Sequence, residues 1–293
     1  MSKISLIIPV FNSSKFIRAC LDSIINQDYQ DFEIILVNNG SKDNTLFLIK
    51  EFYPEVRVID NRENLGACTA RNKGIEIAGG EWILTLDCDT VLEKDFFKKL
   101  VEFADESEGD VGMFQPKILQ MDKKSIYSCG IYLSNLRRFY DIGRGRFNNG
   151  KFDKMRYVFG PCSAAALYKR QMLEEIKEDS GYFDKRFFFL VEDVDLAWRA
   201  QKKGWKAKFC PQAICYHFGN ASNFNRKIRQ YLCFRNRYYL MIKNENIRNL
   251  CTKLPFLFFY DFPRVFSLLL TNAYSLKALR EIASFIKSKN NKK

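Results

Sequence analysis

The sequence predicts an α/β protein with a mostly parallel central sheet flanked by helices. In the first half of the chain, short runs rich in Ile, Val and Leu alternate with segments whose apolar residues have helical spacing. Near-continuous apolar runs are typical of strands buried on both faces, and their alternation with helices is typical of a parallel sheet. The chain has 293 residues, of which 47% are hydrophobic, so it can form a substantial core.

The first half contains four expected strands and three expected helices. The strands are the apolar runs, and the helices are the segments in which apolar residues recur every three or four positions. The expected strands are residues 4–10, 32–37, 56–59 and 82–86, and the expected helices are residues 16–25, 67–78 and 95–104.

The second half has a more mixed pattern. A polar stretch rich in Gly and Asn, residues 137–156, is expected to form a mobile loop. Gly204 lies where a helix usually stops, so a helix is expected just before it. The expected strands are residues 111–115, 126–133, 158–167 and 213–218, the expected helix is 192–203, and the chain after residue 225 is expected to be mainly helical.

Cysteine usage and hydropathy indicate a cytoplasmic protein. The nine Cys form no C-x-x-C pair, so reduced thiols are expected and a zinc site is not. The first apolar run contains Pro9 and lacks a cleavage site, which favours a strand over a signal peptide. The best candidate for a spanning helix, residues 254–270, is interrupted by Asp261, Pro263 and Arg264, so no spanning helix is expected.

The positive charge is concentrated at the C-terminal end. Residues 226–293 carry 15 Lys or Arg and 3 Asp or Glu, a net charge of +12, whereas residues 1–225 carry a net charge of +1. This pattern fits a nucleic-acid binder or a helix pair on an anionic membrane. A helix packed on the rest of the protein is the alternative. The aromatic residues of this segment include Phe256, Phe258, Phe259, Tyr260, Phe262 and Phe266, and Leu276, Leu279, Ile282, Ala283 and Ile286 share one face of a further helix.

Polar residues follow three of the expected strands. Pro9 to Asn12 follow the first strand, Asn38 to Ser41 the second, and Asp87-Cys88-Asp89 the fourth. Ligands of open α/β sheets bind outside the carboxyl ends of the strands, so these segments are expected to border one cleft. Taken singly, each is also explained by the preference of Asn, Asp, Gly and Pro for turns.

Asp87, Asp89 and His217 form a candidate metal site. Two carboxylates at the end of a buried strand suit Mg²⁺ or Mn²⁺, which bind few protein ligands together with substrate phosphates. His217, the only histidine, ends another expected strand, and an imidazole ligand favours Mn²⁺. The alternatives are that Asp89 caps a turn and that His217 is a structural residue.

A second acidic group, Glu192-Asp193-Val194-Asp195, begins an expected helix. Acidic side chains in a first turn are stabilised by the helix dipole, which is a sufficient structural explanation. The functional alternative is a general base that removes a proton from a hydroxyl group. The sequence lacks G-x-G-x-x-G after the first strand, the P-loop pattern and G-x-S-x-G, which disfavours dinucleotide dehydrogenases, P-loop NTPases and α/β-hydrolases.

Taken together, the motifs resemble the family-2 glycosyltransferases of the GT-A fold, especially their rhamnosyltransferase-like branch. The similarity extends over residues 3–245, and the order and spacing of the motifs agree. The matching stretches are Ser5 to Asn12, Val37 to Ser41, Glu63 to Gly66, Ala70 to Gly74, Leu86 to Asp89, Glu192 to Arg199, and His217 with Gly219 and Ser222.

The resemblance implies roles for individual residues on the donor side. Pro9 and Phe11 would line the base pocket, and Arg71 would contact the nucleotide. Asn38 stands where the family usually has the Asp that reads the pyrimidine, and an amide can also bond to that ring. Asp87 would meet the ribose or a metal-bound water. Asp89 and His217 would bind the metal.

On the acceptor side, Asp193 matches the catalytic base of the family. Cys162 belongs to a segment, residues 160–163, that resembles the strand bordering the acceptor site. Glu192, Arg235 and Arg237 are candidates for contacts with the acceptor or the diphosphate.

The resemblance implies an inverting, metal-dependent transferase. The donor would be a UDP- or dTDP-sugar, with dTDP-rhamnose suggested by the branch, and the acceptor a hydroxyl group of a glycan or lipid-linked glycan. Residues 1–225 would form the catalytic domain, with a nucleotide-binding half of about 1–110 and an acceptor half of about 111–225. Residues 226–293 would form a helical segment able to associate with the cytoplasmic face of a membrane. No nucleic-acid partner is expected.

Three other functions fit part of the sequence. A nucleotidyltransferase shares the sheet and the metal requirement, but it needs a Gly-rich phosphate loop where Pro9 to Asn12 stand. A non-catalytic nucleic-acid-binding protein would explain the basic segment but not acidic residues and a histidine at four element ends. An inactive transferase paralogue is a third alternative, and Asn38 is the feature that favours it.

Overall fold

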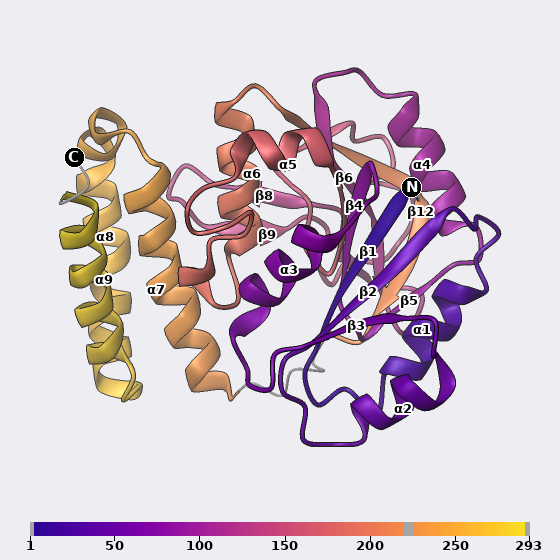
Figure 1. Ribbon diagram of the computed structural model, residues 1–293. Coiled ribbons are helices and arrows are strands. Elements are labelled where there is room, and N and C mark those ends of the chain that lie inside the picture. The colour runs from indigo at the N-terminus through magenta and orange to yellow at the C-terminus, as the bar shows by residue number, and fades with distance from the viewer. Residues whose placement is uncertain (1–2, 220–224, 291–293) are drawn as a thin grey trace.

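The computed structural model describes residues 3–219 and 225–290, so Ser222 of the motif around His217 lies outside the described part. Its centre is one mixed sheet with helices on both faces (Figure 1). The strands of this sheet are β1 (Ile4–Val10), β2 (Phe32–Asn38), β3 (Arg57–Asp60), β4 (Trp82–Leu86), β5 (Thr90–Leu92), β6 (Val111–Gln120), β7 (Ile126–Ser128), β10 (Tyr157–Val158), β11 (Ala165–Lys169) and β12 (Lys206–His217).

The strand order is β10-β12-β6-β11-β4-β1-β2-β3, with β5 beside β12 and β7 beside β6. β4, β1, β2 and β3 are parallel neighbours, as the alternation of strands and helices predicted. β11 is antiparallel to both β4 and β6, and β6 is parallel to β12. β1, β2, β4, β6 and β12 therefore run in one direction, and their carboxyl ends share one edge of the sheet. The predicted α/β class is confirmed.

The helices that cover the sheet arise from the amphipathic segments of the sequence. α1 has a buried face of Ile17, Cys20, Leu21 and Ile24, at the spacing expected of a helix that packs on a sheet. The helices are α1 (Ile17–Ile25), α2 (Thr45–Phe52), α3 (Gly66–Ile77), α4 (Phe96–Asp105), α5 (Arg170–Ile176), the 3₁₀ helix η1 (Lys185–Phe187), α6 (Glu192–Lys202), α7 (Arg226–Asn244), α8 (Ile247–Thr271) and α9 (Ser275–Asn290).

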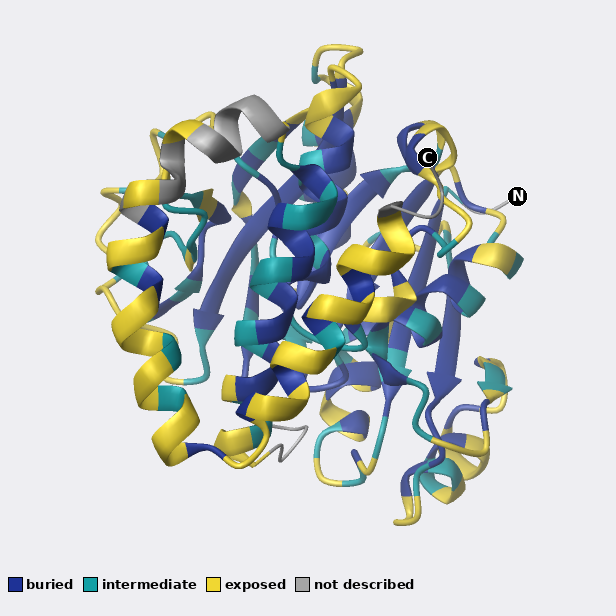
Figure 2. Cartoon of the chain, turned by 90° about the vertical axis from the view of Figure 1, so that its left-hand side faces the viewer, coloured by how far each residue is buried: buried dark blue, intermediate teal, exposed yellow. Residues whose placement is uncertain are grey.

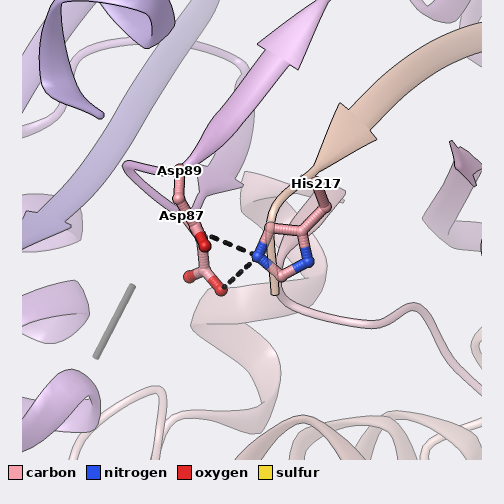
Figure 3. A group of neighbouring side chains, drawn as sticks. All are labelled: Asp87, Asp89 and His217. Atoms are coloured by element: carbon pink, nitrogen blue, oxygen red, sulfur yellow. Dashed lines mark hydrogen bonds and ion pairs between the residues drawn. The ribbon is translucent and has the colours of Figure 1, made fainter. Parts of the chain in front are cut away.

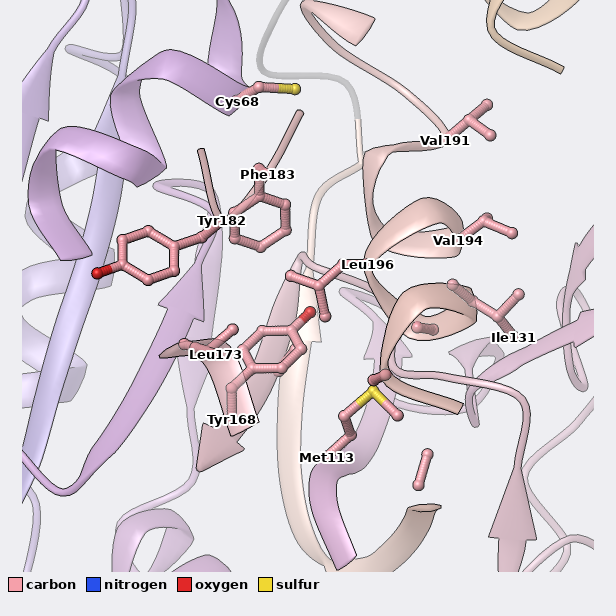
Figure 4. Packing of buried hydrophobic residues seen from close by; sticks show 14 of the residues in the cluster. Cys68, Met113, Ile131, Tyr168, Leu173, Tyr182, Phe183, Val191, Val194 and Leu196 are labelled. Carbon is pink, nitrogen blue, oxygen red and sulfur yellow. The ribbon is translucent and has the colours of Figure 1, made fainter. Parts of the chain in front are cut away.

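The core lies on both faces of the sheet, because successive strand residues point to opposite sides. In β1, Leu6 and Ile8 belong to the cluster beneath α1 and α4, whereas Ile7 belongs to the cluster beneath α3 and α6. Figure 4 shows part of the second cluster, in which Val194 and Leu196 of α6 and Met113 of β6 are drawn. The packing of α6 on this face fixes the position of its first turn.

Two predicted strands are divided in the structure. The expected strand 126–133 is interrupted at Gly130, which has φ +114° and joins β7 to β8 (Ile131–Leu133). The expected strand 158–167 is likewise interrupted between β10 and β11. At Gly160 an added Cβ would lie 2.3 Å from the Cβ of Ala197 in α6, so this crossing tolerates only glycine. The residues between β10 and β11 are not part of the sheet, and Cys162, Ser163 and Ala164 among them line a cleft.

Two other expectations differ from the structure. The stretch 137–156, expected to be a loop, contains β9 (Phe139–Asp141), which forms an antiparallel hairpin with β8. The last strand, expected at 213–218, begins earlier, at Lys206, because β12 pairs along the length of β6. β9 was hidden because the stretch around it is polar, and the early start of β12 could not be predicted because its partner β6 is distant in the chain.

The three last helices pack as a group beside the sheet domain (Figure 1). α7 contacts α6 and η1, and α9 packs along α7, where Tyr239 stacks on Phe285 with ring centroids 4.1 Å apart. α8 and α9 lie on the face turned toward the viewer in Figure 2, and much of their surface is exposed. Within the described parts of the chain, no helix combines the length and the hydropathy needed to cross a bilayer.

Candidate active site

A cleft of about 690 Å³ lies at the carboxyl ends of the strands. It is bordered by the ends of β1, β4 and β12 and by the first turn of α6. Of the twelve residues singled out in the sequence, nine line it and three do not. The nine are Pro9, Phe11, Arg71, Asp87, Asp89, Cys162, Glu192, Asp193 and His217.

Asp87, Asp89 and His217 meet in this cleft (Figure 3). One ligand atom from each of the three lies within 4.8 Å of the others. Nε2 of His217 is 2.9 Å from Oδ1 of Asp89 and 3.7 Å from Oδ2 of Asp87. Asp89 and His217 are 4% and 5% exposed, and the ring of Tyr127 packs edge-on against the imidazole.

Two carboxylates face a single ring nitrogen of His217, and a positive charge at this place would reduce the repulsion between them. A proton on the imidazole or a metal ion would supply that charge. Burial alone would lower the pKa of His217, but its hydrogen bond with Asp89 raises that pKa above its ordinary value. Burial raises the pKa of Asp87, although the Arg71 guanidinium opposes this shift. Oxygen and imidazole ligands suit Mn²⁺ and Mg²⁺.

Arg71 of α3 connects Asp87 of the candidate metal site with α6. Its Nη2 donates to Oδ1 of Asp87 at 3.0 Å, and its Nη1 donates to Oε1 of Glu192 at 2.6 Å. The guanidinium is 2% exposed, and the two carboxylates hold its pKa above the ordinary value although burial opposes this. Glu192 thus neutralises a buried cation, and Arg71 fixes the distance between the strand end and the first turn of α6.

Asp193 is half-buried at the floor of the cleft, in the first turn of α6. Its Oδ2 accepts a 3.3 Å hydrogen bond from the backbone N–H of Ser163, between β10 and β11. Desolvation by the surrounding protein, together with the negative charge of Glu192, raises the pKa of Asp193 to about 7. A carboxylate with such a pKa can accept a proton near neutral pH, the property required of a general base.

The segment that leads to Asp193 has an unusual backbone. Phe188, Leu190 and Val191 have φ values of 65°, 69° and 74°, in the left-handed region that residues other than Gly rarely occupy. Such strain persists only where surrounding contacts impose it, and it is common near functional sites. Here it turns the chain sharply so that α6 begins at the cleft.

Asn236 of α7 holds this segment in place. Its side chain is fully buried, and its Nδ2 lies 3.0, 2.9 and 2.7 Å from the carbonyl oxygens of Phe187, Phe189 and Leu190. Asn236 was not identified from the sequence. A signal existed, because Asn236 shares a helical face with Leu232, Tyr239 and Leu240, and a polar residue on an apolar face indicates a buried hydrogen-bond role.

Three of the predicted site residues lie outside the residues that line the cleft. Asn38 is 1% exposed, donates to Oδ1 of Asp60 at 2.8 Å and accepts from the Ser41 N–H at 3.1 Å. Contact between Asn38 and a base would therefore require a change in these bonds. The adjacent Asn39 does line the cleft.

The other two, Arg235 and Arg237, are engaged within the helical group. Arg235 donates to the carbonyl of Phe187 at 3.0 Å and pairs with Glu281 of α9 at 3.0 Å. Arg237 forms two bonds to Asp261 of α8, at 2.8 and 2.9 Å. The arginine of α7 that does line the cleft is Arg229, which was not singled out from the sequence.

The β8–β9 hairpin forms one wall of the cleft. Phe139, Tyr140 and Asp141 of this hairpin line the cleft. Arg144, just after the hairpin, stacks on Tyr127 at 4.1 Å and pairs with Asp141 at 2.9 Å. Cys162 lies near this wall, and burial raises the pKa of its thiol well above the ordinary value, so the thiolate needed for nucleophilic attack is disfavoured.

Fold and site together define the GT-A class of α/β protein, in which a cluster of metal ligands and a separate carboxylate face one cleft at the strand ends. The chain belongs to glycosyl transferase family 2, whose family model matches residues 5–177. This match includes the strand ends with Asp87 and Asp89 and stops before Asp193 and His217.

Curated relatives have the same family character. The chain is 30% identical over 201 residues to glycosyltransferase GlyA of Streptococcus pneumoniae serotype 4, which covers 66% of this chain and 29% of GlyA. It is 27% identical over 216 residues to a poly-beta-1,6-N-acetyl-D-glucosamine synthase of Staphylococcus epidermidis, which covers 73% of this chain and 49% of the synthase. The chain thus spans less than half the length of these relatives.

Solved structures confirm the fold. A mannosyltransferase, PcManGT of Pyrobaculum calidifontis in complex with GDP-Man and Mn²⁺, aligns with a TM-score of 0.59 at 17% identity and covers 99% of this chain and 75% of that one. S. aureus TarS 1–349 in complex with UDP-GlcNAc aligns with a TM-score of 0.59 at 18% identity and covers 97% and 81%. At these identities the similarity is one of fold.

Proposed function

We propose that this chain is an inverting, divalent-metal-dependent glycosyltransferase that moves a sugar from a nucleotide-diphosphate donor to a hydroxyl group of an acceptor. The observation that carries the proposal is that one cleft holds both the Asp87–Asp89–His217 cluster and the half-buried Asp193, with Arg71 between them. Membership of family 2 supports the same class of reaction.

The ligand set fits a hard divalent cation. Asp89 and His217 would hold it, with Asp87 at the ribose or at a metal-bound water. The position of two carboxylates next to Nε2 of His217 supports this assignment. A metal ion bound between them would replace the proton on Nε2. A bound Mn²⁺ or Mg²⁺ would supply charge neutralisation for the departing nucleoside diphosphate.

Asp193 is proposed as the general base. In a single displacement with inversion, the acceptor hydroxyl attacks the anomeric carbon while the base accepts the hydroxyl proton and the nucleoside diphosphate departs. The pKa of about 7 keeps a large ionised fraction at neutral pH and makes the carboxylate basic enough to accept the proton. The bond from Ser163 N–H and the tight turn at Val191 orient the carboxylate.

The donor is proposed to be a UDP- or dTDP-sugar. Pro9 and Phe11 line the cleft beside Asp87, where the base and ribose would lie. TarS structures contain UDP and UDP-GlcNAc, which favours testing UDP-sugars first, and dTDP-rhamnose follows from the resemblance to rhamnosyltransferases. The acceptor is proposed to be a glycan or lipid-linked glycan that binds against the β8–β9 hairpin. In this proposal residues 1–225 form the catalytic domain and 226–293 an accessory helical segment.

A donor screen tests the proposal. The full chain would be incubated with UDP-, dTDP- and GDP-sugars in the presence of Mn²⁺ or Mg²⁺, and the released nucleotide would be measured by mass spectrometry. We expect UDP or dTDP release from at least one donor, abolished by a chelator. Release from no donor, or equal release in excess chelator, would refute the proposed function.

A further inference from the structure

The surface of the C-terminal helices carries a concentration of exposed apolar side chains. In the described residues, ten of the eighteen exposed large hydrophobic side chains lie between residues 258 and 286. The body of the protein, with more than three times as many described residues, holds the rest. This segment is therefore where an apolar partner would bind.

Six of these side chains form a stripe along α8, which we call the α8 stripe. At about 100° per residue, the stripe covers an arc of about 120° on the helix. The buried Leu257 and Asp261 lie on the opposite side of the helix axis, toward the protein. The side chain of Phe256 lies outside the described part. The stripe consists of Phe258, Phe259, Phe262, Phe266, Leu269 and Leu270, which are 59%, 77%, 59%, 58%, 40% and 72% exposed.

The segment that carries the stripe is strongly basic, with 15 Lys or Arg and 3 Asp or Glu in residues 226–293. The three acidic residues of the segment form ion pairs with arginines: Glu245 with Arg137, Asp261 with Arg237 and Glu281 with Arg235. The exposed cations in the described part of the segment lie on α8 and α9 and at the start of α7. They are Arg226, Lys227, Arg264, Lys277, Arg280, Lys287 and Lys289, of which Lys277 lies 4.0 Å from Glu281.

The C-terminal end of the stripe lies next to a turn that contacts the start of α7. The turn between α8 and α9 is tied to the first turn of α7, where Asn272 Nδ2 donates to the carbonyl of Lys227 at 2.9 Å. Arg229, in the same turn of α7, lines the cleft. In Figure 1 the turn between α8 and α9 lies at the same end of the helical group as the first turn of α7. An anchor bound along α8 would thus hold a substrate close to Arg229.

From these observations we infer that the α8 stripe docks on an anionic lipid bilayer. An exposed aromatic face on a strongly basic helical segment is a combination that binds an anionic membrane surface, since the rings enter the headgroup boundary and the cations meet the lipid phosphates. The inference goes beyond the proposed reaction and rests on it in one respect, namely that the acceptor is lipid-linked. The membrane would then present the acceptor at the Arg229 side of the cleft.

Vesicle sedimentation of the full chain tests the inference. The probes are phosphatidylcholine vesicles with and without phosphatidylglycerol. The triple variant Phe259→Gln, Phe262→Gln and Phe266→Gln replaces three of the six apolar side chains of the stripe. The control variant, Phe47→Gln with Phe147→Gln, removes two equally exposed rings from α2 and from a loop of the body.

We expect binding to anionic vesicles that high salt weakens, and a loss of at least about tenfold in the triple variant but not in the control. Thermal unfolding should be the same for all three proteins, because the replaced rings are exposed. Equal binding by the triple variant, equal binding to neutral vesicles, or a wild-type dimer that the triple variant converts to a monomer would each overturn the inference. Nucleotide release without vesicles, measured in parallel, separates the failure of docking from the failure of the proposed reaction.

Discussion

At the scale of single residues, the proposed reaction depends most on Asp193, whose carboxylate must be ionised to accept a proton. Because the pKa of Asp193 is about 7, kcat/KM should rise as the pH increases through 7 and level off above it. Asp193→Asn replaces the negatively charged carboxylate with a neutral amide of nearly the same shape. It should lower turnover by about 100-fold or more and remove this pH dependence.

Nucleotide affinity, measured by calorimetry, should be unchanged in Asp193→Asn, which distinguishes a base from a structural residue. Asp95→Asn, outside the cleft at the start of α4, is the matched control and should retain wild-type kinetics. Near-native turnover in Asp193→Asn would assign the residue to stabilisation of the helix start instead.

The metal site gives a second prediction at this scale. Asp89→Ala and His217→Ala each remove one of the converging ligands, so Mn²⁺-dependent binding of UDP or dTDP should fall by at least about tenfold. Titration calorimetry with and without Mn²⁺ measures this. If the nucleotide binds equally well to the variants and without metal, the cluster has a purely structural role.

The sequence predicted the residues of this site better than their contacts. Asp87, Asp89 and His217 could be grouped because the two Asp residues follow one strand and His217 ends another, and strand ends of one direction share an edge of the sheet. The pairing of Arg71 with Glu192 could not be predicted, because it joins residues 121 positions apart. Arg235 and Arg237 looked like phosphate ligands because charge alone does not reveal the acidic partners on α8 and α9.

At the scale of elements, α7 has a central role, because its Asn236 donates hydrogen bonds to the strained segment before α6. Asn236→Ala removes a side-chain donor that three carbonyl groups share, although the carbonyl of Phe187 keeps its bond from Arg235. We expect a loss of about 1–3 kcal/mol in the free energy of unfolding, measured with urea. Turnover should fall as well, because the first turn of α6 is no longer fixed. Asn26→Ala, the same change at an exposed position just after α1, is the control and should leave both quantities close to those of the wild type.

A buried ionic group also connects α6 and α7. Nζ of Lys243 lies 2.9 Å from Asp184 and 2.8 Å from Asp195, both fully buried. Burial would raise the pKa of Asp184, but Arg186 and Lys243 together lower it below its ordinary value. Its ionised form therefore stabilises the fold at pH values above about 3.9, the pKa of the unfolded chain, and this contribution is lost on acidification.

Lys243→Met should lower the free energy of unfolding by about 3 kcal/mol at pH 7, because two buried carboxylates lose a shared cation. The difference from wild type should shrink as the pH falls below about 4, where the carboxylates of the unfolded chain become protonated. Urea unfolding at several pH values measures this. Lys203→Met, at the exposed end of α6, is the control. A difference that does not change with pH would show that Lys243 stabilises the fold through packing alone.

Elements differed in how well the sequence predicted them. β1, β2 and β4 were predictable because their apolar runs are continuous and buried on both faces. β9 was hidden in a polar stretch, since its pairing with β8 is set by the turn between them. The sequence did not show which of the last two helices packs on the protein. Ala278, Ile282 and Phe285 of α9 are buried, while the α8 stripe is exposed. This difference arises from the packing of α9 along α7.

At the scale of the whole molecule, a continuous set of contacts connects the candidate metal site, the candidate base and the C-terminal helices. Arg71 spans from Asp87 to Glu192, α6 carries Asp193, and α7 fixes the segment before α6. In the proposal, the basic helices extend this arrangement toward a membrane surface. The proposal as a whole requires that metal and nucleotide bind together in the cleft, within reach of Asp193.

Crystals grown with Mn²⁺ and UDP or dTDP, measured at a wavelength where manganese scatters anomalously, test this requirement most directly. We expect one anomalous peak at coordination distance from Asp89 and His217, with the base against Pro9 and Phe11 and the diphosphate on the metal. Asp89→Ala crystals should lack the peak. A nucleotide bound in the cleft without a peak there, or a peak and nucleotide elsewhere on the protein, would refute the proposed reaction.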